Sequence, residues 1–178
     1  MIKQYIKQLK AINKKGNEYY NFLLKNCRSF NNSDIIQKRE NIIQKYGIRI
    51  RPKSCFYNAQ QLAIFSKGEF KYCEGYAITK VIGFPVEHAW NIKDGKIIDL
   101  SWEDGMEYFG ISIQQKWIKK KFYEYAFKYN ISTSQLINYW EEKHQNEKRN
   151  NKDSKQKMPG LRQGGFYSLQ RNGKNCCS

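Results

Sequence analysis

Apolar residues recur at helical spacing from the start of the chain. The first such face consists of Ile2, Tyr5, Ile6, Leu9 and Ile12, and lysines occupy the opposite side. Gly16 and Asn17 interrupt this pattern, so we expect the first helix to end before them. A second short helix is predicted over residues 18–27, where apolar and aromatic side chains resume.

The next periodic segment predicts a third helix over residues 33–46. Ser33 offers an N-cap for this helix and Gly47 a C-cap. The stretch 47–55 then reads as extended, and a fourth helix is predicted to begin at Cys55. Its apolar face consists of Phe56, Ala59, Leu62 and Ala63, and Gly68 ends it. This reading places Cys55 at a helix N-terminus.

Three strand-like runs follow, over residues 70–82, 85–92 and 96–102. Asp94 and Gly95, between the last two runs, form the strongest short signal for a hairpin turn. This turn pairs Trp90 with Asp99 and places His88 diagonal to Asp99 on the same face. Diagonal neighbours are ~7–8 Å apart at the backbone, which is within reach of an imidazole and a carboxylate.

The helical pattern returns after residue 113. One face of the predicted helix consists of Trp117, Ile118, Phe122, Tyr125, Ala126 and Tyr129. Ser132 and Gln135 form a capping box for a last helix that reaches about His144. From residue 145 onward the chain is polar, rich in lysine and asparagine, and predicted to be disordered.

Together these elements predict an α+β fold with a small antiparallel sheet and flanking helices. The N-terminal helices over 1–48 are expected to pack on a core formed by 49–113. The C-terminal helices over 114–144 and a basic tail over 145–178 complete the predicted organisation.

Composition narrows the class of protein. At 178 residues the chain is long enough for one domain with a hydrophobic core. Its hydrophobic fraction of 40% and aromatic fraction of 15% argue against wholesale disorder. There is no run of about 18 apolar residues and no secretory signal pattern. We therefore expect a cytoplasmic protein without stable membrane insertion.

The five cysteines are Cys27, Cys55, Cys73, Cys176 and Cys177, and they form no CxxC pair. In a reducing compartment an odd number of such cysteines is expected to stay as free thiols. The sequence has no glycine-rich phosphate loop, no HExxH and no cluster with metal-ligand spacing. We expect neither a metal nor an organic cofactor.

The formal net charge is +16, and its density is highest from Lys143 to the end of the chain. One explanation is contact of the basic surface and tail with nucleic acid or another polyanion. The other is a solvated lysine- and asparagine-rich composition without such a partner. No RNA-binding signature is present in the sequence.

Candidate chemistry comes from Cys55, His88 and Asp99. A helix N-terminus favours the thiolate form of Cys55, and the nearby Arg51 and Lys53 act in the same direction. Asp99 has apolar neighbours, among which an unpaired buried charge costs several kcal/mol. A role in which Asp99 orients His88, and His88 takes the proton of Cys55, explains all three residues. The alternative is an inert thiol, a satisfied strand histidine and an exposed acid.

The order of these residues resembles the transglutaminase-like branch of the papain-like cysteine enzymes. The stretch HAWNIKDGKIIDLSW, residues 88–102, is similar to the His-Ala-Trp strand, hairpin and Asp strand of that branch. The likeness covers about residues 50–111 and extends to small phage and bacterial proteins of this type. It implies that Cys55 is the nucleophile, His88 the base and Asp99 the orienting acid.

The chain differs from this branch in its spacing, and its oxyanion donor is expected from the backbone. His88 follows Cys55 by 33 residues, which is compact for the branch. No side chain is assigned to an oxyanion hole, so the backbone N–H of Cys55 is the expected donor.

Three further residues are weaker candidates for contact with substrate. Glu74 either contacts substrate beside the hairpin or is a solvated strand acid. Trp90 and Trp102 are expected to form a wall of the cleft or part of the core.

These features predict a thiol-dependent hydrolase or acyl transferase that acts on an amide of a protein or peptide. Hydrolysis is favoured over transamidation because water needs no second binding site. The alternative is a non-enzymatic basic adaptor, built on a degenerate enzyme fold, that binds nucleic acid or protein.

Overall fold

The computed structural model describes residues 1–13, 17–31, 39–126, 134, 136, 139–146 and 149. Its labelled elements are α1 (Ile2–Ile12), α2 (Asn17–Asn26), β1 (Arg28–Asn31), α3 (Arg39–Tyr46), α4 (Cys55–Phe65), β2 (Lys71–Thr79), β3 (Val86–Lys93), β4 (Lys96–Ile98), β5 (Gly105–Ser112) and α5 (Gln115–Ala126). The predicted α+β class with a small antiparallel sheet is confirmed.

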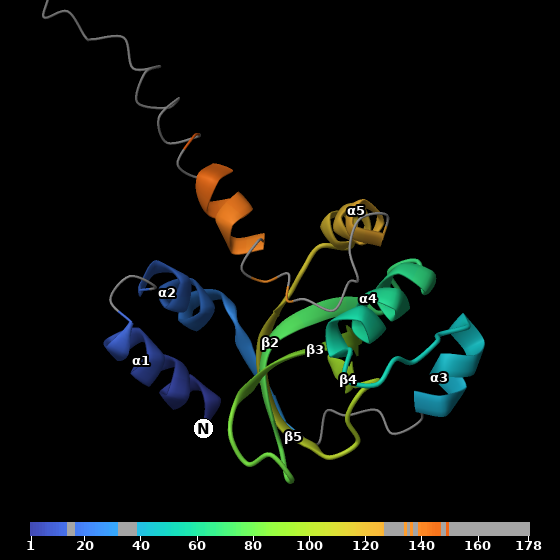
Figure 1. The fold of residues 1–178 in the computed structure, drawn as a ribbon, viewed down its shortest axis with the longest axis horizontal. Coiled ribbons are helices and arrows are strands. Elements are labelled where there is room, and N and C mark those ends of the chain that lie inside the picture. The colour runs from blue at the N-terminus through green and yellow to red at the C-terminus, as the bar shows by residue number, and fades with distance from the viewer. Residues whose placement is uncertain are drawn as a thin grey trace, which may run out of the picture. The chain divides into compact units, whose positions relative to one another are not determined.

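The strands form an antiparallel sheet in the order β1-β5-β2-β3-β4, shown in Figure 1. The hydrophobic pattern predicts neither β1 nor β5. β1 has only four residues, and β5 contains Gly105 and Gly110, which weaken the strand pattern. Both strands are identified only by their pairing with partners that are distant in sequence.

Gly110 has a packing role in β5. A Cβ atom at this position would collide with the backbone of Glu74 and the ring of Trp90. Gly110 pairs with Gly75 of β2, where a Cβ atom would collide with the β5 backbone. The two glycines therefore allow a close approach of β2 and β5 and leave room for the Trp90 ring.

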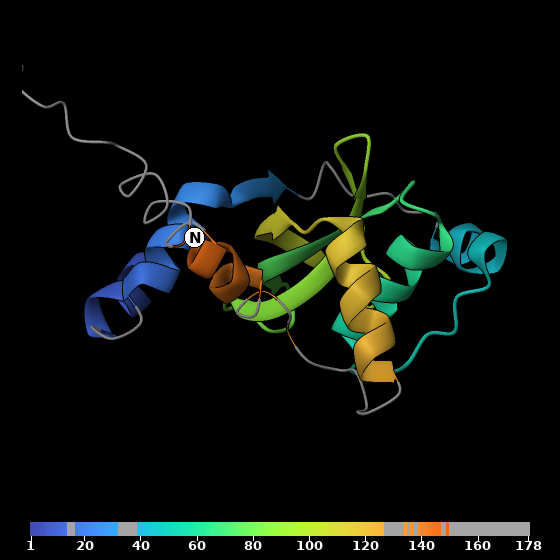
Figure 2. The same cartoon turned by 90° about the horizontal axis from the view of Figure 1, so that it is seen from above.

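Helices cover one face of the sheet. The sheet contributes Tyr72, Tyr76, Ile78, Ala89 and Phe109 to this core, and the helices contribute Ile2, Ile6, Leu23, Ala59, Ala63 and Ile118. Figures 1 and 2 show α1 and α2 beside the β5 side of the sheet and α4 against β2 and β3. The predicted apolar face of the first helix is thus buried at Ile2 and Ile6.

The opposite face of the sheet carries a second cluster. Its buried members are Phe30, Cys73, Ala77, Trp90, Ile92, Ile97 and Tyr108, and Trp102 packs against them. Because side chains alternate along a strand, His88 shares this face with Trp90, two residues further along β3. The imidazole of His88 therefore lies against this second cluster, with its ring nearly parallel to that of Trp90.

The predicted hairpin has the expected register at its turn. The observed pairs are Lys93 with Lys96, Ile92 with Ile97 and Asn91 with Ile98. Asp94 and Gly95 both have positive φ, as a type I′ turn requires. β4 ends at Ile98, so the prediction of a strand through Asp99 to Trp102 is wrong. The Asp99 carboxylate accepts hydrogen bonds from the next backbone N–H groups, and this turn replaces strand pairing.

Helices α1, α2 and α5 begin close to their predicted starts, whereas the described part of the third predicted helix begins at Arg39. α4 begins at Cys55, as predicted, and ends at Phe65, before Gly68. Predicted features outside the described residues are Ser33, Tyr129, Ser132, Gln135 and the tail from residue 150. No helix in the described ranges combines the length and apolarity needed to cross a bilayer.

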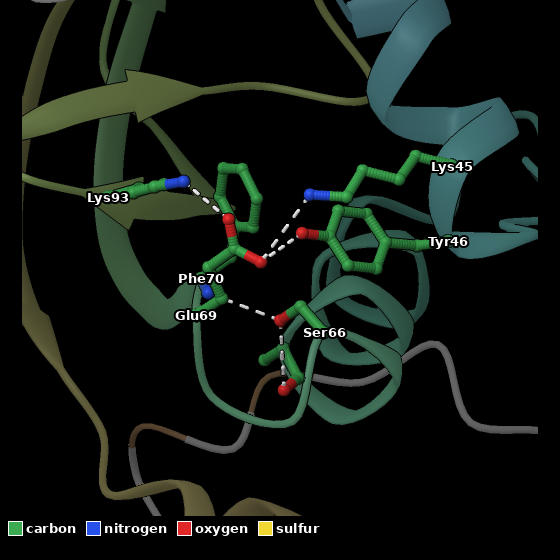
Figure 3. A network of polar contacts seen from close by, with 7 residues as sticks. Lys45, Tyr46, Ser66, Glu69, Phe70 and Lys93 are labelled. Carbon is green, nitrogen blue, oxygen red and sulfur yellow. Dashed lines mark hydrogen bonds and ion pairs between the residues drawn. The ribbon is translucent and has the colours of Figure 1, made fainter.

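Glu69, between α4 and β2, connects α3 to the β3–β4 hairpin (Figure 3). Its carboxylate accepts hydrogen bonds from the Tyr46 hydroxyl and the Lys93 ammonium, and Lys45 Nζ lies 3.8 Å from it. The bonds from Lys93 and Tyr46 lower the pKa of Glu69 from 4.5 to about 2. The charged carboxylate therefore helps to hold α3 on the core.

Replacement Glu69→Gln tests this connection. Because the pKa of Glu69 is lower in the folded than in the unfolded chain, its stabilisation is present above pH 4.5 and is lost as pH falls toward 2. We expect the variant to unfold at lower denaturant concentration than the wild type at neutral pH. The difference should shrink between pH 4.5 and 2. Glu40→Gln, at an exposed position of α3, is the control, and a pH-independent difference would contradict the prediction.

Candidate active site

Asp99 occupies the centre of the candidate site, directly after β4. Its Oδ2 lies 2.7 Å from Nε2 of His88 and accepts a hydrogen bond from the Tyr108 hydroxyl at 2.8 Å. Its Oδ1 accepts hydrogen bonds from the backbone N–H groups of Ser101 and Trp102 at 2.9 and 3.0 Å. One carboxylate thus joins β3, β5 and the loop that follows β4.

His88 and Asp99 form a buried ion pair. Their exposed fractions are 0% and 3%. Burial alone lowers the pKa of His88, because it disfavours the charged ring. The charge and hydrogen bond of Asp99, and after them the interaction with Cys55, outweigh burial and raise this pKa from 6.5 to about 9. The imidazole is therefore protonated at neutral pH.

Two indole rings flank the imidazole. The Trp102 ring stacks on His88 with parallel planes and a centroid distance of 3.5 Å. The Trp90 ring lies nearly parallel to His88 at 6.4 Å. Trp90 is fully buried, and Trp102 is half-buried. Trp90 therefore belongs to the core behind the imidazole, and Trp102 holds the plane of the ring.

Cys55 opens α4, where the first N–H groups have no partner within the helix and the dipole is positive. The thiol is half-buried, and its interaction with His88 contributes to the raised imidazole pKa. Nε2 of His88 is engaged in the hydrogen bond with Asp99, so Nδ1 is the ring nitrogen left to exchange a proton with Cys55.

The Cys55 thiol interacts with the His88 ring without forming a well-aligned hydrogen bond. Nδ1 has no partner of normal hydrogen-bond geometry within the described part of the chain. Bonds between catalytic groups commonly shorten only in the complex with substrate. The arrangement is therefore compatible with proton transfer between Cys55 and His88 after a small adjustment.

The other described cysteines have a different environment. Burial raises the pKa of Cys27 and of Cys73 to about 12. Both are therefore protonated thiols at neutral pH. Of the three described cysteines, Cys55 is the one beside an imidazolium.

Glu74 lies apart from the His88–Asp99 pair. It is 1% exposed, so the expectation of a solvated strand acid is wrong. Its Oε2 accepts a hydrogen bond from Tyr72 at 2.7 Å, and its Oε1 accepts from the Ser134 hydroxyl and from the Leu136 backbone at 3.0 Å. Glu74 lies two residues from Tyr72 on β2, so both side chains point to the helix-covered face. There Glu74 anchors the segment that contains Ser134 and Leu136 to β2.

Sequence reasoning missed two residues near the pair. Tyr108 donates to Asp99 from β5, and only recognition of β5 as a strand beside β2 would have found it. Asn58 is buried in α4 and bonds to the backbone of Arg51 in the preceding loop. The sequence signal for Asn58 is an asparagine in an otherwise apolar helix, because a buried amide there needs hydrogen-bond partners.

Two described cavities lie elsewhere. One, of about 300 Å³, is beside Glu69 and Lys93, and one, of about 360 Å³, is beside Gly68 and Gln115. Cys55, His88 and Asp99 line neither of them. Within the ranges that the structure covers, no group of three or more His, Cys, Asp or Glu side chains could hold a metal ion.

Comparisons with known proteins add no assignment. Family models, curated proteins and solved structures contain no match to this chain. The likeness to transglutaminase-like enzymes therefore stays a prediction from the residues themselves.

Titration of His88 by ¹⁵N NMR tests the ion pair. We expect a midpoint near pH 9, because Asp99 and Cys55 favour the imidazolium. The raised pKa also stabilises the fold fully below pH 6.5, and this contribution is lost as pH rises through about 9. In Asp99→Asn the midpoint should fall to 6.5 or lower, because burial alone opposes the charge.

The chain has only two histidines, so the spectrum of His88→Gln identifies the signals of His88. Tyr108→Phe is the matched control, since it removes a neutral hydrogen bond to Asp99 and keeps the charge. A wild-type midpoint at or below 6.5 would contradict the ion pair.

Proposed function

We propose that this protein is a cysteine-dependent hydrolase that cleaves an amide bond of a protein or peptide. The observation that carries the proposal is the buried His88–Asp99 pair, with Nε2 and Oδ2 2.7 Å apart and the Cys55 thiol beside the ring. Cys55 supplies the nucleophile, His88 transfers protons, and Asp99 orients the imidazole and stabilises its charge.

In the first step, the Cys55 thiolate attacks the amide carbonyl carbon. Backbone N–H groups in the first turn of α4, which begins at Cys55, would stabilise the oxyanion. Protonated His88 gives the proton on Nδ1 to the amide nitrogen, the C–N bond breaks, and an amine leaves. An acyl-thioester on Cys55 is the product of this step.

In the second step, His88 accepts a proton from water as the water oxygen attacks the thioester carbon. The C–S bond then breaks, which releases a carboxylic acid and restores the thiolate–imidazolium pair. An amine in place of water would give transamidation by the same residues. Hydrolysis is the simpler reaction, because it needs no site for a second substrate.

A basic adaptor that binds nucleic acid or protein is the second candidate, favoured by the net charge of +16. An adaptor has no use for a reactive thiol. The pH dependence of Cys55 chemistry therefore distinguishes the two functions.

Alkylation by iodoacetamide measures this reactivity. In a background with Cys176 and Cys177 replaced by serine, we expect Cys55 to be alkylated faster than Cys27 at mildly acidic pH, because the imidazolium of His88 lies beside it. His88→Ala removes the imidazolium, so alkylation at mildly acidic pH should fall at least about ten-fold. Peptide mapping by mass spectrometry assigns the modified residue.

Cys27→Ser is the matched control, because Cys27 is also half-buried and burial raises the pKa of its thiol to about 12. This variant should keep the wild-type alkylation profile. Ordinary thiol behaviour at Cys55, together with salt-sensitive binding of RNA or DNA, would contradict the enzyme and favour the adaptor.

A further inference from the structure

Asn58, in the first turns of α4, uses its whole amide in hydrogen bonds. Its Oδ1 accepts from the backbone N–H of Arg51, and its Nδ2 donates to the backbone C=O of Arg51, both at 2.9 Å. Nδ2 also donates to the Ser101 hydroxyl at 3.2 Å. The side chain is buried, with 1% exposed.

The first two bonds fix the loop that leads into Cys55. Asn58 binds the N–H and the C=O of Arg51, the two backbone groups that a neighbouring strand would bind in a sheet. Its own backbone N–H donates to the carbonyl of Ser54, the residue before Cys55, at 2.9 Å. The approach of the chain to the nucleophile is therefore held at two points by one residue of the helix that Cys55 begins.

The third bond reaches the other half of the site. Ser101 accepts from Asn58 through its hydroxyl and donates to Oδ1 of Asp99 through its backbone N–H at 2.9 Å. Asp99 in turn binds His88. Asn58 thus links the segment of the nucleophile to the segment of the base and acid, which lie 33 residues or more away in the sequence.

Other buried amides near Asn58 do not make this link. Gln61 donates to the backbone carbonyl of Arg49 at 3.1 Å, which ties the same loop to α4 alone. Asn91 donates to the carbonyl of Ala59 at 2.8 Å, which ties β3 directly to α4. Gln61 therefore provides a matched comparison, because it holds the loop without contact to the His88–Asp99 side.

We propose that Asn58 is a positioning residue, which sets the place of the Cys55 thiol relative to the His88 imidazole through Arg51 and Ser101. This inference rests on the proposed function, since it assumes that Cys55 and His88 exchange a proton. An error of about 1 Å between reacting groups costs up to about a hundred-fold in rate. Replacement of Asn58 should therefore lower the reactivity of Cys55 by more than its effect on the stability of the fold would explain.

The test compares Asn58→Ala, Ser101→Ala and Gln61→Ala in the full chain with Cys176 and Cys177 replaced by serine. The readouts are the pH profile of Cys55 alkylation by iodoacetamide, the His88 midpoint by ¹⁵N NMR and the thermal midpoint of unfolding. For Asn58→Ala we expect a loss of roughly ten- to a hundred-fold in alkylation rate at mildly acidic pH. Ser101→Ala should lose less, in the same direction, because it removes only the hydrogen bond from Asn58 and keeps the backbone bond to Asp99.

Gln61→Ala should lower the thermal midpoint of unfolding. Its rate of Cys55 alkylation should stay within about two-fold of the wild type at each pH, since uncoupled sites act independently. If Asn58→Ala does not fold, Ser101→Ala still tests the link, because its side chain is only half-buried. Wild-type profiles in both Asn58→Ala and Ser101→Ala would overturn the positioning role and leave the proposed enzyme intact. A wild-type protein whose Cys55 behaves as an ordinary thiol would overturn both.

Discussion

The arrangement of this site depends on the buried carboxylate of Asp99. Its two oxygens accept hydrogen bonds from His88, Tyr108 and two backbone N–H groups, so the charge is solvated by the protein instead of by water. A buried carboxylate with fewer partners would be protonated or would be expelled to the surface. The same four bonds end β4, orient the imidazole and fix the loop that carries Trp102. The need to solvate the buried Asp99 carboxylate therefore determines both the local backbone conformation and the orientation of the imidazole.

The site has one half on the sheet and one half on a helix. The sheet half is rigid, because His88 lies between Asp99 and the stacked ring of Trp102. The helix half begins with Cys55, after a loop whose backbone must be held by side chains, since none of the described strands pairs with it. Hydrophobic packing of α4 places the helix on β2 and β3, but such packing is not directional. The directional part comes from amide bonds such as those of Asn58. Packing thus brings the halves together, and hydrogen bonds set their separation.

Local signals in the sequence predict much of this arrangement. The Asp94–Gly95 turn fixes the hairpin register as far as the pair Asn91–Ile98, and Asp99 follows directly, within hydrogen-bond distance of His88. The start of α4 at Cys55 follows from the apolar pattern after it. The strand expected through Asp99 is wrong, because the aspartate's own side chain bonds to the backbone ahead and ends the pairing. β5 and Tyr108 lie beyond local reasoning, because Gly105 and Gly110 weaken the strand pattern and the pairing with β2 is a tertiary contact.

The buried pair also bears on whether this fold supports chemistry or only binding. Burying an imidazolium and a carboxylate costs several kcal/mol in desolvation, and apolar side chains of similar volume often give a more stable protein. The neighbours of the pair on this face of the sheet are already apolar or aromatic, so a hairpin selected only for folding could continue that pattern through position 88. A surface adaptor would place its charges where a polyanion could reach them, yet His88 is 0% exposed. The cost is understandable if the ring must be held charged, oriented and shielded from water beside the Cys55 thiol. That requirement belongs to a proton-transfer site, and it favours the enzyme over the adaptor.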